Sequence, residues 1–165
     1  MGMYPGKRNK MRYLTELIGN NPLRALSWKE PYGSLMLQGK VETRTWPTNY
    51  RGWVLMCASK QPYRKDAVMR ISRSQTGRIN AAFGFDDLYM GEAEGYYRGY
   101  AFAVGALIDC RPMEPKDEGI CYVDWYKHLY CHVYDSVQRI ETIPWRGTQG
   151  WRTVSPDVIK KIILL

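Results

Sequence analysis

The sequence contains no apolar run approaching the roughly 20 residues that a membrane-spanning helix requires, so no membrane partner is expected. Positive charges near its start are not followed by an apolar stretch, which argues against a secretory signal. There is no Cys-x-x-Cys pair, and the four cysteines and two histidines match no usual zinc spacing. We therefore expect an intracellular protein, cytoplasmic unless nuclear, with reduced cysteines, no metal and no cofactor.

Internal repeats and low-complexity blocks are also absent, and 13% of the 165 residues are aromatic. This composition excludes general disorder and suits one domain with a substantial core. We predict a basic N-terminal tail over residues 1–21 and a single domain over residues 22–165. Two acidic insertions are expected within that domain, near residues 75–99 and 112–129.

The net charge of +8 is unevenly distributed along the chain. Residues 1–78 are strongly basic, with 15 basic and 4 acidic residues. Residues 79–124 are acidic, with 3 basic and 9 acidic residues, and residues 125–165 are mildly basic, with 6 basic and 3 acidic residues. One interpretation is that these segments pair with one another or face solvent. The other is that both ends of the chain form an electropositive face that attracts phosphate groups.

Strand patterns dominate the chain and lie far apart in it, with short helical patterns between them. Apolar or alternating residues predict the strands, and proline followed by apolar residues marks two of the helices. The pattern favours an α+β protein, a small mixed β-barrel of about five to seven strands with short flanking helices. The expected strands are 23–28, 41–46, 53–59, 100–110, 130–143 and 151–154, and the expected helices are 13–18, 31–38, 64–73 and 156–165.

Residues 25–60 read ALSWKEPYGSLMLQGKVETRTWPTNYRGWVLMCASK. This string resembles the opening half of the activating signal cointegrator homology (ASCH) domain, a member of the PUA-like superfamily of small pseudo-barrels. The E-P-aromatic helix start, the Gly39-Lys40 turn and the E-x-R strand carry the resemblance, and IPWRGTQGWRTV resembles the closing loop more loosely. The turn is two residues shorter than in many members, so Lys40 need not point as the family's lysine does.

The resemblance implies a PUA-like barrel in which the late loop faces a cleft formed by the first helix and the E-x-R strand. Independently, alternation along a strand places Glu42, Arg44 and Trp46 on one face. Either Glu42 and Arg44 form a solvent-exposed ion pair that contributes little to stability, or the three side chains form a binding surface. In the second case, Glu42 positions the Arg44 fork for a phosphate or base edge, and Trp46 stacks on an unpaired base.

We predict that the protein binds single-stranded or modified RNA, another nucleic acid or a nucleotide-like small molecule in a basic, aromatic-lined cleft. The oligomeric state is left open. The predicted binding residues come from the first helix start, the E-x-R strand, the end of the next strand and the late loop. They are Trp28, Lys29, Lys40, Glu42, Arg44, Trp46, Ser59, Lys60, Arg146 and Gln149.

Two alternative functions remain. Some relatives in the resembled family are acetylcytidine amidohydrolases that use a Lys–Thr–Glu constellation, and some have been regarded as ribonucleases. The nearest equivalents here are Lys40, Thr43 or Thr45, and Glu42, although a lysine acts as a base only where burial lowers its pKa. The last alternative is a protein-interaction regulatory domain, which an exposed apolar patch would indicate.

Overall fold

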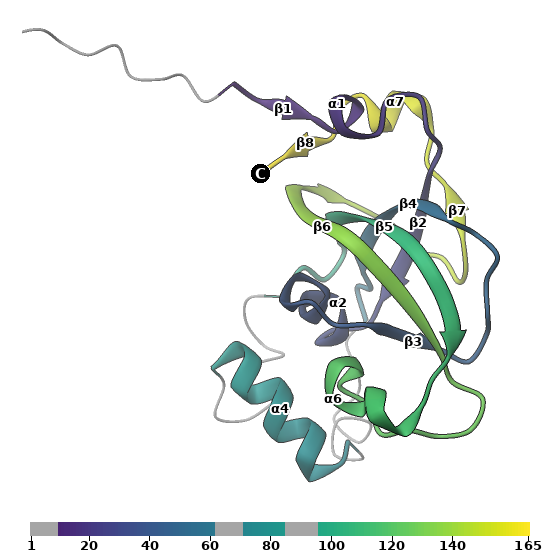
Figure 1. Ribbon diagram of the computed structural model, residues 1–165. Helices are drawn as coiled ribbons and strands as arrows, with labels where there is room; N and C mark the ends of the chain where they lie inside the picture. Colours follow the sequence, from purple (N-terminus) through teal and green to yellow (C-terminus); the bar gives the residue numbers. More distant parts are fainter. Residues whose placement is uncertain (1–9, 62–70, 85–95) are drawn as a thin grey trace, which may run out of the picture.

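The computed structural model describes residues 10–61, 71–84 and 96–165. Its centre is a mixed sheet that curls into a half-barrel with short helices around it (Figure 1), so the predicted α+β class is confirmed. The sheet has eight strands, of which three are only two residues long. They are β1 Arg12–Tyr13, β2 Leu23–Trp28, β3 Glu42–Arg44, β4 Gly52–Ala58, β5 Tyr100–Pro112, β6 Tyr130–Pro144, β7 Arg152–Thr153 and β8 Ile163–Leu164.

The helices are short, as expected, and lie outside the sheet. In the described residues, the longest helix has eleven residues, and no helix is both long and apolar enough to cross a membrane. The helices in the described residues are α1 Leu14–Ile18, α2 Tyr32–Leu35, the 3₁₀ helix η1 Met36–Gln38, α4 Arg73–Phe83, the 3₁₀ helix η2 Pro115–Asp117, α6 Glu118–Cys121 and α7 Pro156–Ile159.

The strand order is β1-β8-β6-β5-β4-β2-β7, and β3 also pairs with β6. β2 runs parallel to β4, with Trp28 beside Ala58, so the carboxyl ends of both strands lie at the same edge of the sheet. β3 is antiparallel to β6, with Thr43 opposite Cys131. The long strand β6 therefore holds β3 at its start and β8 near its end.

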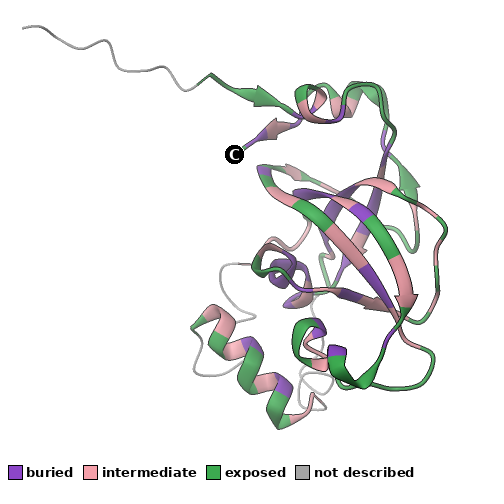
Figure 2. Cartoon of the chain, in the orientation of Figure 1, coloured by how far each residue is buried: buried purple, intermediate pink, exposed green. Residues whose placement is uncertain are grey.

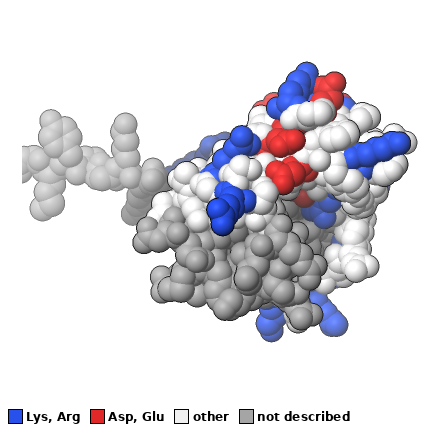
Figure 3. Space-filling model, turned by 90° about the horizontal axis from the view of Figure 1, so that it is seen from below, with Lys and Arg blue, Asp and Glu red and all other residues white. Residues whose placement is uncertain are grey.

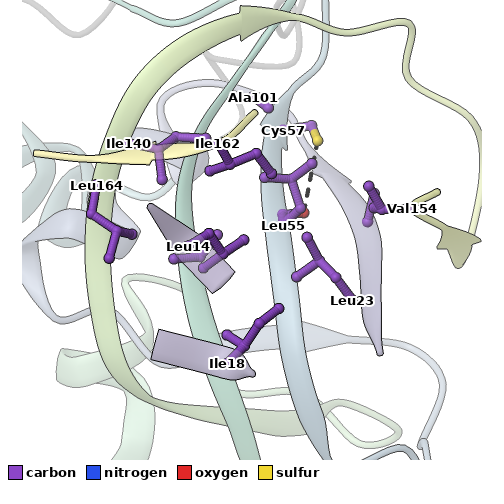
Figure 4. Close-up of a cluster of buried hydrophobic side chains, with 12 residues drawn as sticks. Leu14, Ile18, Leu23, Leu55, Cys57, Ala101, Ile140, Val154, Ile162 and Leu164 are labelled. Atoms are coloured by element: carbon purple, nitrogen blue, oxygen red, sulfur yellow. Dashed lines mark hydrogen bonds between the residues drawn. The ribbon is translucent and has the colours of Figure 1, made fainter. Parts of the chain in front are cut away.

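Buried residues are concentrated in the central strands of the sheet (Figure 2). One cluster joins α1 to β2, β4 and the C-terminal segment, and Figure 4 shows Leu14 and Ile18 pointing toward this cluster. A second cluster, on the other face, contains Leu26, Trp28 and Phe102. The alternation of β2 thus supplies both clusters, as a strand covered on both faces should.

Gly105 lies in β5 where the register with β6 shifts, as is common for a glycine inside a strand. A Cβ on Gly105 would lie 2.8 Å from Met56 Cε and 3.1 Å from Val137 Cγ2. Only glycine therefore lets these two side chains approach the β5 backbone without displacement.

The structure corrects the boundary of the predicted N-terminal tail. Arg12 and Tyr13 pair with β8, and Leu14 and Ile18 of α1 are fully or almost fully buried. Residues 12–18 therefore belong to the folded domain, because their apolar side chains complete the first cluster. Residues 1–9 of the predicted tail lie outside the described residues.

One helix prediction is corrected and another is left untested. Most of the helix expected over residues 64–73 lies outside the described residues, while α4 begins at Arg73 and continues into the first predicted acidic insertion. Ser72 caps this helix by accepting a hydrogen bond from Gln75 N. The expected C-terminal helix ends at Ile159, because Ile162 and Leu164 turn into the core and Leu164 pairs with β1.

The second insertion is held against the sheet by polar contacts. Both Asp117 carboxylate oxygens accept hydrogen bonds from Arg111, at 2.7 and 2.9 Å, and these bonds hold the pKa of Asp117 well below its ordinary value. Trp125 Nε1 donates to Met113 O at 2.9 Å. Trp125 therefore braces the insertion, although its side chain remains partly exposed.

Candidate functional site

The described residues form a large cleft, of about 1390 Å³, beside the carboxyl ends of β2 and β4. Its lining comes from five parts of the chain that are distant in sequence. These are residues 27–29 and 32 at and after the end of β2, residues 42–46 of the β3 segment, residues 59–61 after β4, residues 98–100 before and at the start of β5, and residues 144–150 at and after the end of β6, together with Leu129.

Basic residues predominate in this lining. Among the residues that the structure describes, it contains five lysines and arginines and a single acidic residue, Glu42. The basic residues are Lys29, Arg44, Lys60, Arg98 and Arg146. An excess of positive charge in a concave surface concentrates field lines and favours an anionic ligand.

Glu42 is the acidic centre of this region and is almost completely buried. Its Oε2 accepts from Lys40 Nζ at 3.1 Å, and its Oε1 lies 3.1 Å from Arg44 Nε. Burial alone would raise the pKa of Glu42, but the Lys40 and Arg44 charges outweigh this effect and hold the pKa below its ordinary value. Glu42 is therefore an ionised carboxylate between two cations.

The Arg44 guanidinium is fixed by contacts from several sides. Arg44 Nη2 donates to Ser27 O at 3.0 Å, and Arg44 Nε is paired with Glu42. The guanidinium carbon lies 5.1 Å from the centroid of the Trp28 ring and 5.9 Å from that of Trp46. The side chain remains 20% exposed, so a preoriented planar fork reaches the cleft.

Trp46 is positioned by aromatic neighbours and by His132. The rings of Trp46 and His132 meet edge to face, with centroids 5.0 Å apart, and Trp151 packs edge-on at 6.0 Å. His132 Nε2 lies 2.9 Å from Trp46 O. Burial lowers the pKa of His132, so it is neutral near pH 7 and donates this hydrogen bond from Nε2.

The loop over residues 144–150 lines the cleft beside Ser27. A Cβ on Gly147 would lie 2.9 Å from Ser27 Oγ, so the absence of a side chain permits this close approach. Trp145 N donates to Gly99 O at 2.9 Å, and the Arg152 guanidinium lies 5.3 Å from the centroid of the Trp145 ring. The loop is thus attached both to the segment before β5 and to β2.

A buried carboxylate supports the start of α2 at the edge of the cleft. Glu30 Oε2 accepts from Ser34 N at 2.8 Å, while Oε1 accepts from Ser34 Oγ at 2.7 Å and Tyr97 N at 3.2 Å. Burial raises the pKa of Glu30 despite these donors. Glu30 thereby connects α2 with the segment that carries Arg98.

Nine of the ten predicted binding residues line this cleft. Lys40 does not: only 1% of its side chain is exposed, and its Nζ donates to Val41 O and Glu42. Among the predicted catalytic residues, Thr43 and Glu42 line the cleft with Thr45, but the Lys40 amino group is turned away from it.

The sequence reasoning missed other lining residues, of which Arg98 and Tyr100 are the most relevant. Arg98 forms a bridge with Ala58, and Gly99 N donates to Ala58 O at 2.9 Å. The only local signal was an arginine and a tyrosine flanking Gly99, a positive-φ glycine that directly precedes β5. Their place in the cleft depends on that non-local bridge.

Outside the cleft, the charge is mixed. Seen from below, acidic side chains lie among lysines and arginines on the described surface (Figure 3). In the described part of the chain, no three His, Cys, Asp or Glu side chains gather as metal ligands would. Comparison with known families finds no matching family model, and comparison with curated proteins finds no significant match.

Proposed function

We propose that this protein binds single-stranded or modified RNA, or a nucleotide, in the cleft beside β2 and β4. The observation that carries the proposal is the preoriented guanidinium of Arg44, which contacts Glu42, Ser27 O and two indole rings while remaining partly exposed. A planar arginine fork suits a phosphate group or a base edge, and the Trp46 ring beside it suits stacking on a base.

The arrangement favours unpaired nucleotides over a duplex. In a duplex the bases are stacked on one another, so their faces are closed to an aromatic side chain at the bottom of a cleft. The other basic side chains of the cleft supply attraction to phosphates without reading sequence. The resemblance of residues 25–60 to the ASCH domain supports the same proposal, because the E-x-R strand that carries it lines this cleft.

The test is a titration with fluorescently labelled, unstructured single-stranded RNA at about 50 and 200 mM salt, followed by anisotropy. An unlabelled RNA duplex and an unlabelled single strand of equal length serve as competitors. The Lys60→Ala variant removes a charge from the cleft, and Lys160→Ala removes one from the exposed residue that follows α7.

We expect binding that weakens as salt increases, stronger competition by the single strand, and a loss of affinity for Lys60→Ala but not for Lys160→Ala. Absence of binding would overturn the proposal, as would equal effects of the two substitutions. Salt-independent binding would indicate that the basic residues of the cleft do not contact phosphates.

A further inference from the structure

A second group of aromatic side chains lines the cleft at a distance from Arg44 and Trp46. Tyr100, the first residue of β5, lines the cleft and is 43% exposed. Trp145, on the loop after β6, lines it too, and its backbone is bonded to Gly99 next to Tyr100. Neither residue belongs to the group of contacts around Glu42 and Arg44.

The strand pairing fixes how far apart the two groups lie. Trp28 of β2 is beside Ala58 of β4, and Ala58 is bridged in turn to Arg98. Two strand spacings therefore separate the backbone carrying Trp28 from the segment that carries Tyr100, which amounts to about 10 Å. Stacked rings are about 3.4 Å apart, so a single base packed between two aromatic rings would hold them only about 7 Å apart. One base therefore cannot stack on both aromatic groups, whereas two bases can.

Positive charge lies between and around the two aromatic groups. Lys60 follows β4, which is the strand between them, and its side chain runs along Gly99: a Cβ on Gly99 would lie 3.9 Å from Lys60 Cγ. Arg98 and Arg146 line the same part of the cleft. The order across the cleft is thus an aromatic group, a basic group and a second aromatic group.

We infer that the ligand is a strand of at least two nucleotides, rather than a single nucleotide. One base packs at Arg44 and Trp46, another packs at Tyr100, and Lys60 and Arg98 contact the phosphate that joins them. The inference rests on the proposed function, which would be equally satisfied by a mononucleotide. The cleft volume of about 1390 Å³ exceeds the roughly 300–1,000 Å³ typical of small-molecule pockets, which agrees with a longer ligand.

The experiment measures affinity against ligand length by calorimetry. The probes are an equimolar mixture of the four nucleoside monophosphates and mixed-sequence RNA strands of two, three and six residues. Tyr100→Ala removes the second aromatic group without changing charge, and Tyr100→Phe retains the ring. The matched control is Tyr126→Ala, since Tyr126 is 52% exposed but does not line the cleft.

We expect the two- and three-residue strands to bind at least about ten-fold more tightly than the mononucleotides, because a second base and its phosphate are engaged. In the Tyr100→Ala variant, the ratio of strand affinity to mononucleotide affinity should be smaller than in the wild type by about five-fold or more. In Tyr100→Phe and Tyr126→Ala this ratio should be retained. The retained gain in Tyr100→Phe would identify stacking, rather than the hydroxyl group, as the source.

Equal affinity for mononucleotides and strands would overturn this inference and leave the proposed function standing. The same gain with length in Tyr100→Ala as in the wild type would also overturn it, because the gain would then come from charge alone. If neither mononucleotides nor strands bind, the proposed function fails and this inference fails with it.

Discussion

Lys40 Nζ lies 3.1 Å from Glu42 Oε2, and the Lys40 side chain is only 1% exposed. The other oxygen of the same carboxylate faces Arg44. Lys40 therefore neutralises and orients the group that orients Arg44, from a position that a ligand in the cleft does not reach. The lysine is a positioning residue for the arginine, and this arrangement has consequences for stability as well as for binding.

Replacing Glu42 by Gln should destabilise the protein by about 3 kcal/mol or more, because the buried Lys40 charge loses its compensating carboxylate. Urea unfolding followed by tryptophan fluorescence measures this change. The double variant Lys40→Met/Glu42→Gln should regain more than half of the loss, since it removes the buried charge as well. Equal stability of the single variant and the wild type would show that the pair contributes nothing.

Replacing Arg44 by Lys should weaken RNA binding by about ten-fold, because the charge is kept but the planar fork held by Glu42 and Ser27 is lost. The matched control is Arg146→Lys, on an exposed side chain of the same cleft. That substitution should change affinity by less than about two-fold, since a phosphate contact requires only the charge. Similar losses in both variants would contradict a special role for the Arg44 fork.

Lys40 should not be required for hydrolysis of acetylcytidine or RNA, since its amino group donates to Val41 O and Glu42 and does not line the cleft. Chromatography of both substrates after incubation with wild type and Lys40→Met tests this directly. Substrate turnover by the wild type that disappears in a folded Lys40→Met variant would revive the hydrolase alternative. Circular dichroism of the variant establishes that it is folded.

The free energy of unfolding should depend on His132 as the pH falls below about 6.5. Burial lowers the pKa of His132 in the folded state, so the unfolded chain binds a proton more readily and stability falls toward acid pH. The slope contributed by His132 is at most about 1.4 kcal/mol per pH unit.

Urea unfolding at pH 7.5, 6.5 and 5.5 measures that slope in the wild type and in His132→Gln, where the slope should be smaller. An unchanged slope in His132→Gln would contradict the assignment.

Much of the site follows from local sequence. Strand alternation predicted that Glu42, Arg44 and Trp46 share a face, and all three line the cleft, but Thr43 and Thr45 line it as well and Trp46 lies beyond the end of β3. Lys40 departs from the prediction because Gly39, at φ 85°, ends η1 and turns the chain so that Lys40 Nζ meets Glu42 in the interior. Arg98 and Tyr100 could not be predicted, because a bridge to Ala58 brings them to the cleft.

The fold shows the same division between local and distant causes. The strands β2, β4, β5 and β6 were correctly predicted, and β4 is the clearest of them, since a continuous apolar run marks a strand covered on both faces. The helix predicted after Ser155 was too long, because no local signal shows that Leu164 pairs with Arg12 and joins the core. Propensity there is overridden by packing against α1.

The pairing of β3 with the start of β6 has a dynamic consequence. A three-residue strand can open readily by itself, whereas β6 is also paired with β5 over most of its length and with β8 near its end. When β3 detaches, β6 therefore stays in place, and Arg44 can return to the same register. Amide protons of the β3–β6 pairing should exchange with solvent faster than those of the β5–β6 pairing, because β3 can open locally.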